Sequence, residues 1–118
     1  MNDLSIYFKP CISEDIAFEE EQMGQILVSN YGAFPEIETD SIAIFSVPEF
    51  RGDANEIKLE SESQFRKELL QLSRSKNWTR KIYDLGTIVP GENLEDTYFA
   101  VSNVTSELIK HRVIPILI

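Results

Sequence analysis

The chain contains a single histidine, His111, which is the side chain most often used as a general base or a metal ligand near neutral pH. It stands between Lys110 and Arg112, and Glu107 is the only carboxylate one helical turn away. No second histidine is present to complete a metal site. We interpret His111 as part of a cationic group at the C-terminal end of a helix, where positive charge is favourable.

The chain also contains one cysteine, Cys11, so no internal disulfide can form. Its only basic neighbour is Lys9, and it directly follows Pro10. A nucleophilic cysteine needs a lowered pKa, which nearby cations or a helix N-terminus provide. The pattern therefore favours an ordinary thiol in a reducing compartment.

Among the carboxylates, Asp84 is the one candidate for a site residue, and the three consecutive glutamates are not. Glu19, Glu20 and Glu21 are consecutive, and on a helix they would point in different directions, which favours a solvated face over an ion site. Asp84 lies near the end of a predicted strand, where site residues are common, but an aspartate before Leu85 and Gly86 is equally typical of a turn. Both interpretations of Asp84 remain open.

Glycine-rich phosphate loops are absent from the sequence. The sequence alone therefore predicts no catalytic, cofactor-binding or metal-binding residue in this chain.

Composition limits the classes of partner. The 118 residues suffice for one hydrophobic core, and 42% of them are hydrophobic. A formal net charge of -9 repels phosphate backbones and anionic lipid surfaces, so we expect neither a nucleic-acid partner nor a membrane partner. The first residues carry no basic and apolar leader pattern, and no apolar run reaches the length of a membrane span. The expected location is the cytoplasm.

Three short runs predict strands, and the first and the last have the apolar composition of strands buried inside a sheet. They span residues 41–47, 80–88 and 113–118. Two segments with helical spacing follow the first two runs: residues 62–73, and a longer helix that begins after the N-cap residue Asn93 and ends near Arg112. A further helix is predicted, with weaker spacing, between residues 13 and 27.

Alternation of strands and helices predicts an α/β fold with a parallel sheet and right-handed crossovers. We expect residues 1–40 to form a divergent N-terminal segment and residues 41–118 to form the α/β part. The last run, Val113–Ile118, has the composition of a strand inside a sheet, and no turn or polar tail follows it. The sequence is therefore expected to continue in a longer protein.

Several of these segments resemble the ureohydrolase superfamily of arginase, agmatinase and formimidoylglutamase. The resemblance rests on the order of three motifs over residues 41–118: a core strand ending in Ser46-Val47-Pro48, an aspartate-x-glycine strand at Asp84-Leu85-Gly86, and an apolar strand containing Pro115. Phe65 and Arg66 stand where the family often has Ile-Arg.

Departures from the family pattern indicate a divergent member. Ser46 replaces the usual glycine, the Gly-Pro pair before the helix is absent, and Thr87 stands where the family often has an aspartate.

The resemblance implies a three-layer α/β/α, arginase-like fold, interrupted here before the metal site. It also implies a parent enzyme with two manganese ions that activate a water molecule to attack a small guanidino or formimino substrate. The family's metal ligands follow the segment that corresponds to this chain, so the chain would be inactive alone. A homo-oligomer is compatible with this interpretation.

Two alternatives belong to other functional classes. One is a noncatalytic relative that keeps the α/β fold as a scaffold. The other is a protein-interaction module that pairs the exposed edge of its last strand with another chain. For the chain by itself, the sequence predicts marginal stability or self-association.

Overall fold

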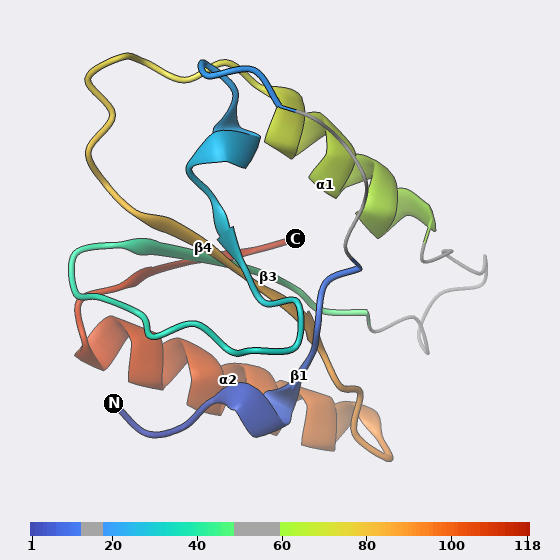
Figure 1. The fold of residues 1–118 in the computed structure, drawn as a ribbon. Helices are drawn as coiled ribbons and strands as arrows, with labels where there is room; N and C mark the ends of the chain where they lie inside the picture. The colour runs from blue at the N-terminus through green and yellow to red at the C-terminus, as the bar shows by residue number, and fades with distance from the viewer. Residues whose placement is uncertain (13–17, 49–59) are drawn as a thin grey trace.

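The computed structural model describes residues 1–12, 18–48 and 60–118, and these form a mixed α/β structure with a five-stranded sheet (Figure 1). The strands are β1 (Phe8–Lys9), β2 (Val28–Ser29), β3 (Ile42–Ser46), β4 (Ile82–Ile88) and β5 (Ile114–Leu117). The α-helices are α1 (Glu60–Gln71) and α2 (Leu94–Lys110). Short 3-10 helices, η1 and η2, occupy Ser5–Tyr7 and Met23–Gln25.

The sheet has the strand order β1-β4-β3-β5, and β2 also pairs with β4. β3 pairs in parallel with both β4 and β5, and β2 runs parallel to β4, whereas β1 is antiparallel. The connections from β3 to β4 and from β4 to β5 each contain one α-helix, as parallel neighbours require. The predicted parallel β-α-β-α-β core is therefore confirmed, and the complete sheet is mixed.

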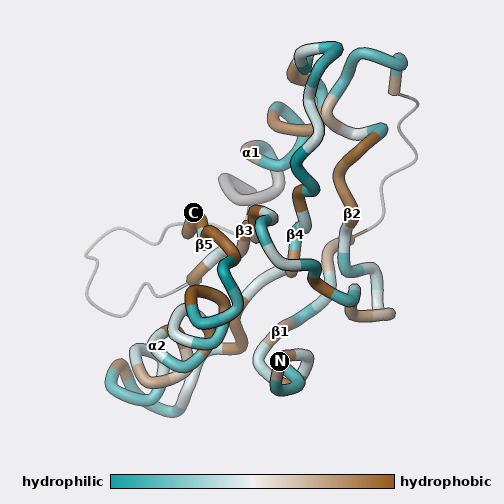
Figure 2. Tube along the Cα trace, turned by 90° about the vertical axis from the view of Figure 1, so that its left-hand side faces the viewer, coloured by the Kyte–Doolittle hydropathy of each residue, from teal (hydrophilic) through white to brown (hydrophobic). Residues whose placement is uncertain are grey.

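Apolar side chains cover both faces of this sheet. On one face, Phe45 and Leu85 belong to a buried cluster with Val104 and Leu108 of α2. On the other face, a smaller cluster around Ile44 packs against α1 and the η2 segment. The helices therefore lie on opposite faces of the strands, as Figure 2 shows. Neither helix in the described ranges has the length and apolarity that a membrane crossing requires.

The ends of α2 follow from its sequence. The side chain of Asn93 accepts a hydrogen bond from the backbone N–H of Asp96 at 2.9 Å, which confirms the predicted N-cap. After the last turn, Arg112 adopts a left-handed conformation with φ 62°. Buried Val113 then donates its N–H to the carbonyl of Leu108 at 2.9 Å, so the chain turns directly into β5.

The helix predicted between residues 13 and 27 is wrong where the structure describes it. Residues 13–17 lie outside the described ranges, and within 18–27 the only helical element is the 3-10 turn at Met23–Gln25. Met23 donates its N–H to the carbonyl of Leu72 beyond α1, at 2.7 Å. This contact with a distant segment replaces the local bonding of an α-helix. The first 40 residues also supply β1 and β2 to the sheet.

The last strand has the predicted position but not the predicted burial. Exposed fractions are 47% for Ile114, 41% for Ile116 and 46% for Leu117. The reason is the strand order, because β5 is the last strand on its side and no described segment pairs with its outer edge. The strand predicted at 41–47 is buried as expected. The strand predicted at 80–88 begins at Ile82 and is buried, whereas Arg80 and Lys81 precede it and are exposed.

Candidate functional site

A polar cluster lies between α1 and the sheet, inside an otherwise apolar face. Its centre is an ion pair between Arg66 of α1 and Asp84 of β4. Arg66 Nε donates to Asp84 Oδ2 at 2.8 Å, and Nη2 donates to Oδ1 at 3.2 Å. The exposed fractions of the two side chains are 15% and 5%. This two-bond geometry is the arrangement in which a guanidinium binds a carboxylate most strongly.

The same guanidinium also contacts groups near the carboxyl ends of β3 and β4. Nη2 of Arg66 lies 2.8 Å from the carbonyl oxygen of Gly86 and 3.1 Å from Ser46 Oγ. Ser46 Oγ lies 2.9 Å from Thr87 Oγ1, so two hydroxyl groups meet where β3 ends. We refer to these five residues as the Arg66 cluster.

A β-bulge in β4 makes this grouping possible. Side chains alternate between the two faces of a regular strand, so Asp84 and Thr87, three positions apart, would normally face opposite sides. The pairing with β3 shifts by one residue, however, since Ile44 pairs with Asp84 while Phe45 pairs with Gly86. The extra residue reverses the alternation and brings both polar side chains to the α1 face.

Gly86 is required at this bulge for two reasons. Its φ of +101° is unfavourable for residues with a side chain, and a Cβ there would overlap the carbonyl oxygen of Lys9. Its N–H donates to Asp84 Oδ1 at 3.1 Å. Both carboxylate oxygens of Asp84 are therefore bonded to donors within the protein, and this carboxylate joins the bulge to α1.

Of the two interpretations of Asp84, the turn is wrong, and the site residue stays a prediction. Asp84 lies in the interior of β4, not in a turn, and it is 4% exposed. The sequence did not identify Arg66, Ser46 or Thr87 as its neighbours. The usable signal was the aspartate-x-glycine pattern, in which Gly86 marks the bulge.

Cys11 lies beside this cluster, with its Sγ 3.9 Å from the Asp84 carbonyl oxygen. Burial, together with the negative charge of Asp84, raises the pKa of its thiol from 9.0 to about 12, although Arg66 acts in the opposite direction. At neutral pH the thiol is protonated and weakly nucleophilic. This agrees with the interpretation of Cys11 as an ordinary thiol.

His111 caps the C-terminal end of α2, as the sequence predicted. Its Nε2 lies 3.2 Å from Glu107 Oε1. The pKa of Glu107 is lowered, first by the hydrogen bond from the backbone N–H of Asn2 and then by the charges of Lys110 and His111. Glu19, Glu20 and Glu21 are all exposed, and they lie in an irregular turn and not on a helix.

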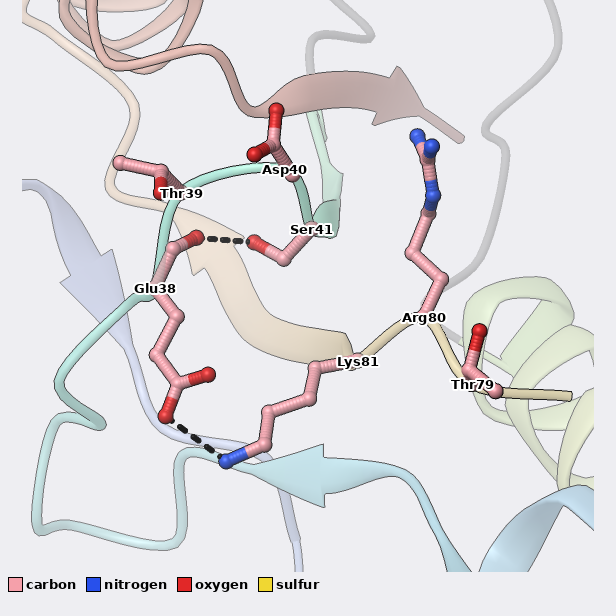
Figure 3. Close-up of a pocket in the computed structure, with 7 residues that line it drawn as sticks. All are labelled: Glu38, Thr39, Asp40, Ser41, Thr79, Arg80 and Lys81. Atoms are coloured by element: carbon pink, nitrogen blue, oxygen red, sulfur yellow. Dashed lines mark hydrogen bonds and ion pairs between the residues drawn. The ribbon is translucent and has the colours of Figure 1, made fainter.

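A surface hollow of about 350 Å³ lies at the opposite, amino-terminal edge of β3 and β4 (Figure 3). It is lined by Glu38, Thr39, Asp40, Ser41, Thr79, Arg80 and Lys81. Lys81 pairs with Glu38 at 2.8 Å, and Asp40 pairs with Arg112 at 3.1 Å. The side chains of both pairs are exposed, and ion pairs of this kind are weak. The hollow is separate from the Arg66 cluster.

A manganese site does not form among the described residues, because nowhere in that part of the chain do three His, Cys, Asp or Glu side chains converge. Asp84 is bonded to Arg66 instead. Comparisons of the chain with protein-family models, with curated proteins and with solved structures found no match.

Proposed function

We propose that this chain forms the N-terminal α/β part of a ureohydrolase-like enzyme that cleaves a carbon–nitrogen bond in a small guanidino or formimino compound. The proposal rests on the family resemblance of residues 41–118. The observation that supports it best is the Arg66 cluster. It links three of the resembling segments, since Arg66, Ser46 and the Asp84–Gly86 pattern all contact one another.

The position of the cluster is also relevant. In open α/β sheets, ligands bind beyond the carboxyl ends of the parallel strands. Ser46 and Thr87 lie at that end of β3 and β4. Arg66 of α1 is hydrogen-bonded to Ser46, and the hydroxyl of Ser46 is hydrogen-bonded to that of Thr87. The cluster therefore fixes the edge of the sheet beside which a substrate would bind, without itself providing a reacting group.

The fold of the proposed enzyme is the three-layer arginase-like arrangement. The helices on opposite faces of the sheet are compatible with it. Because the described residues do not form a manganese site, the ligands of any such metal come from other residues of the proposed enzyme. The role that we assign to this chain is positioning of the sheet edge.

Activity of the natural protein that contains this chain tests the proposal. The purified protein is incubated with arginine, agmatine and N-formimino-glutamate, with added Mn²⁺ and after treatment with a chelator. We expect urea or formamide to form from one of these compounds only when Mn²⁺ is present. Absence of both products with all compounds would overturn the enzyme proposal, and absence of bound metal as well would favour the noncatalytic scaffold.

A further inference from the structure

Helix α2 lies at the outside of the described structure, and its solvent-exposed face lacks charged side chains over most of its length (Figure 2). Residues 97–109 contain a single charged residue, Glu107, which lies on another side of the helix and accepts the N–H of Asn2 at 3.0 Å. The outward face of a surface helix normally carries charged and polar side chains. Here it carries three large hydrophobic side chains and two serines, which we call the outer face of α2: Tyr98, Phe99, Ser102, Ser106 and Ile109.

The large side chains of the outer face remain mostly in contact with solvent. Exposed fractions are 60% for Tyr98, 68% for Phe99 and 59% for Ile109. Because successive residues of an α-helix are rotated by about 100°, the five residues fall within about one third of its circumference. The buried residues Val104 and Leu108 point to the other side, into the core against the sheet. A contiguous exposed surface of this kind favours association with a partner.

Charges of opposite sign flank the outer face at its two ends. Glu95 lies in the first turn and Lys110 in the last, and both are exposed on the same side of the helix as Ser102. Glu95 is seven residues before Ser102, and Lys110 is eight residues after it. In an antiparallel pair of α2 helices centred on Ser102, Glu95 of one copy and Lys110 of the other therefore differ by about 1.5 Å along the helix axis. The outer face is complementary in charge to an inverted copy of itself.

The sizes of the side chains fit the same arrangement. Phe99 precedes Ser102 by three residues and Ser106 follows it by four, so each Phe99 lies opposite a serine of the second copy. Tyr98 correspondingly lies opposite Thr105, and Ser102 meets its counterpart at the two-fold axis. Small side chains at a crossing point allow two helices to approach closely.

A parallel pair fits less well, because it would set each aromatic residue against its own counterpart and Glu95 against Glu95. The helix dipole by itself accounts for an acidic first turn and a basic last turn. It does not account for the uncharged, hydrophobic residues between them.

We propose that the outer face of α2 is the contact surface between two copies of this chain, paired antiparallel about a two-fold axis at Ser102. A two-fold contact uses the same patch on both copies, as this geometry does. One helix from each copy gives a contact at the lower end of specific interfaces, roughly 1,200 Å² in total, so the dimer is expected to dissociate on dilution. The proposal does not depend on the proposed hydrolysis.

Sedimentation velocity of the natural protein over a concentration series tests the dimer. At about 0.15 M salt, the repulsion between the two acidic copies is screened beyond about 8 Å. We expect reversible dimerisation. Ser102→Glu places two like charges at the axis and should weaken it by at least about 10-fold, whereas the matched Ser102→Ala should preserve it. A monomer at every concentration, or unchanged association of Ser102→Glu, would overturn the proposal.

A charge exchange tests the antiparallel orientation. Glu95→Lys and Lys110→Glu should each weaken dimerisation, because each sets like charges against one another, and the double variant should recover it. Both substitutions also oppose the helix dipole, and that loss of helix stability accumulates in the double variant, whereas the pairing recovers. Circular dichroism measures the helix separately. Failure of the double variant to recover dimerisation would refute the antiparallel pair, and would favour a partner of another kind on this face.

Discussion

Arg66 and Asp84 form a two-bond ion pair that joins helix α1 to strand β4, with N–O distances of 2.8 and 3.2 Å. Both side chains are largely removed from solvent, so each compensates part of the charge of the other. Among the ion pairs between residues that the structure describes, Arg66–Asp84 is the one in which both side chains are largely buried.

Replacement of Asp84 by asparagine should lower the free energy of unfolding by about 3 kcal/mol, because it leaves the Arg66 charge buried without this counterion. Urea denaturation measures the change. Glu38→Gln is the matched control, since it removes the partner of Lys81 in an exposed ion pair and should have little measurable effect. Equal effects of the two substitutions would contradict the structural role of the Arg66–Asp84 pair.

Replacement of Gly86 by alanine should destabilise the protein by at least about 2 kcal/mol, because the positive φ disfavours a side chain and the Cβ would overlap the Lys9 carbonyl. Gly32→Ala is the control. Gly32 has a φ of +123°, but no atom lies within 4 Å of the position that a Cβ would occupy there. Thermal denaturation should therefore show a larger loss for Gly86→Ala, and a larger loss for Gly32→Ala would refute the steric argument.

Replacement of Arg112 by glycine should raise stability by about 1 kcal/mol, since glycine adopts the left-handed conformation at the end of α2 without strain. The exposed ion pair with Asp40 is lost, at little cost. Arg112→Ala loses the same ion pair but keeps the strain, so it should not stabilise. Melting temperatures of the two variants distinguish the conformational effect from the charge effect.

The Cys11 thiol should make stability decrease at high pH. Its pKa is raised from 9.0 to about 12 in the folded protein, so the folded state holds the thiol proton more tightly than the unfolded state. This contribution is complete below pH 9 and is lost as the pH rises from 9 toward 12. Between about pH 8 and pH 11, wild-type protein should lose more stability than Cys11→Ala, as measured by urea denaturation.

The same thiol should react slowly with an alkylating reagent at about pH 8 while the protein is folded, and rapidly in denaturant. Equal rates in the two states would contradict the raised pKa.

The regular elements could be predicted because their signals are local. Apolar runs defined β3, β4 and β5, and the Asn93 cap fixed the start of α2. The pairing of Arg66 with Asp84 was not predictable, because it depends on how α1 crosses the sheet. The bulge at Gly86 also escaped prediction, since its register depends on the strand beside it.

The incorrect predictions also arise from contacts between segments that are distant in the sequence. A weakly periodic segment near Met23 became a 3-10 turn because its backbone bonds to the segment after α1. Strand β5 has an interior composition, but composition cannot specify how many strands lie beyond it. Local pattern therefore predicted the elements, whereas long-range contacts decided their environment.

Pairing of β1 with β4 has a consequence for the order in which the chain acquires its structure. Phe8 is paired across the ladder with Ile88, and Tyr7 contacts Asn103, which lies 96 residues later in the chain. During synthesis on a ribosome, β1 emerges before β4 and cannot form this ladder until β4 has followed it. Residues of β1 are thus made well before the strand that they pair with, and their place in the sheet is completed only after β4 has been made.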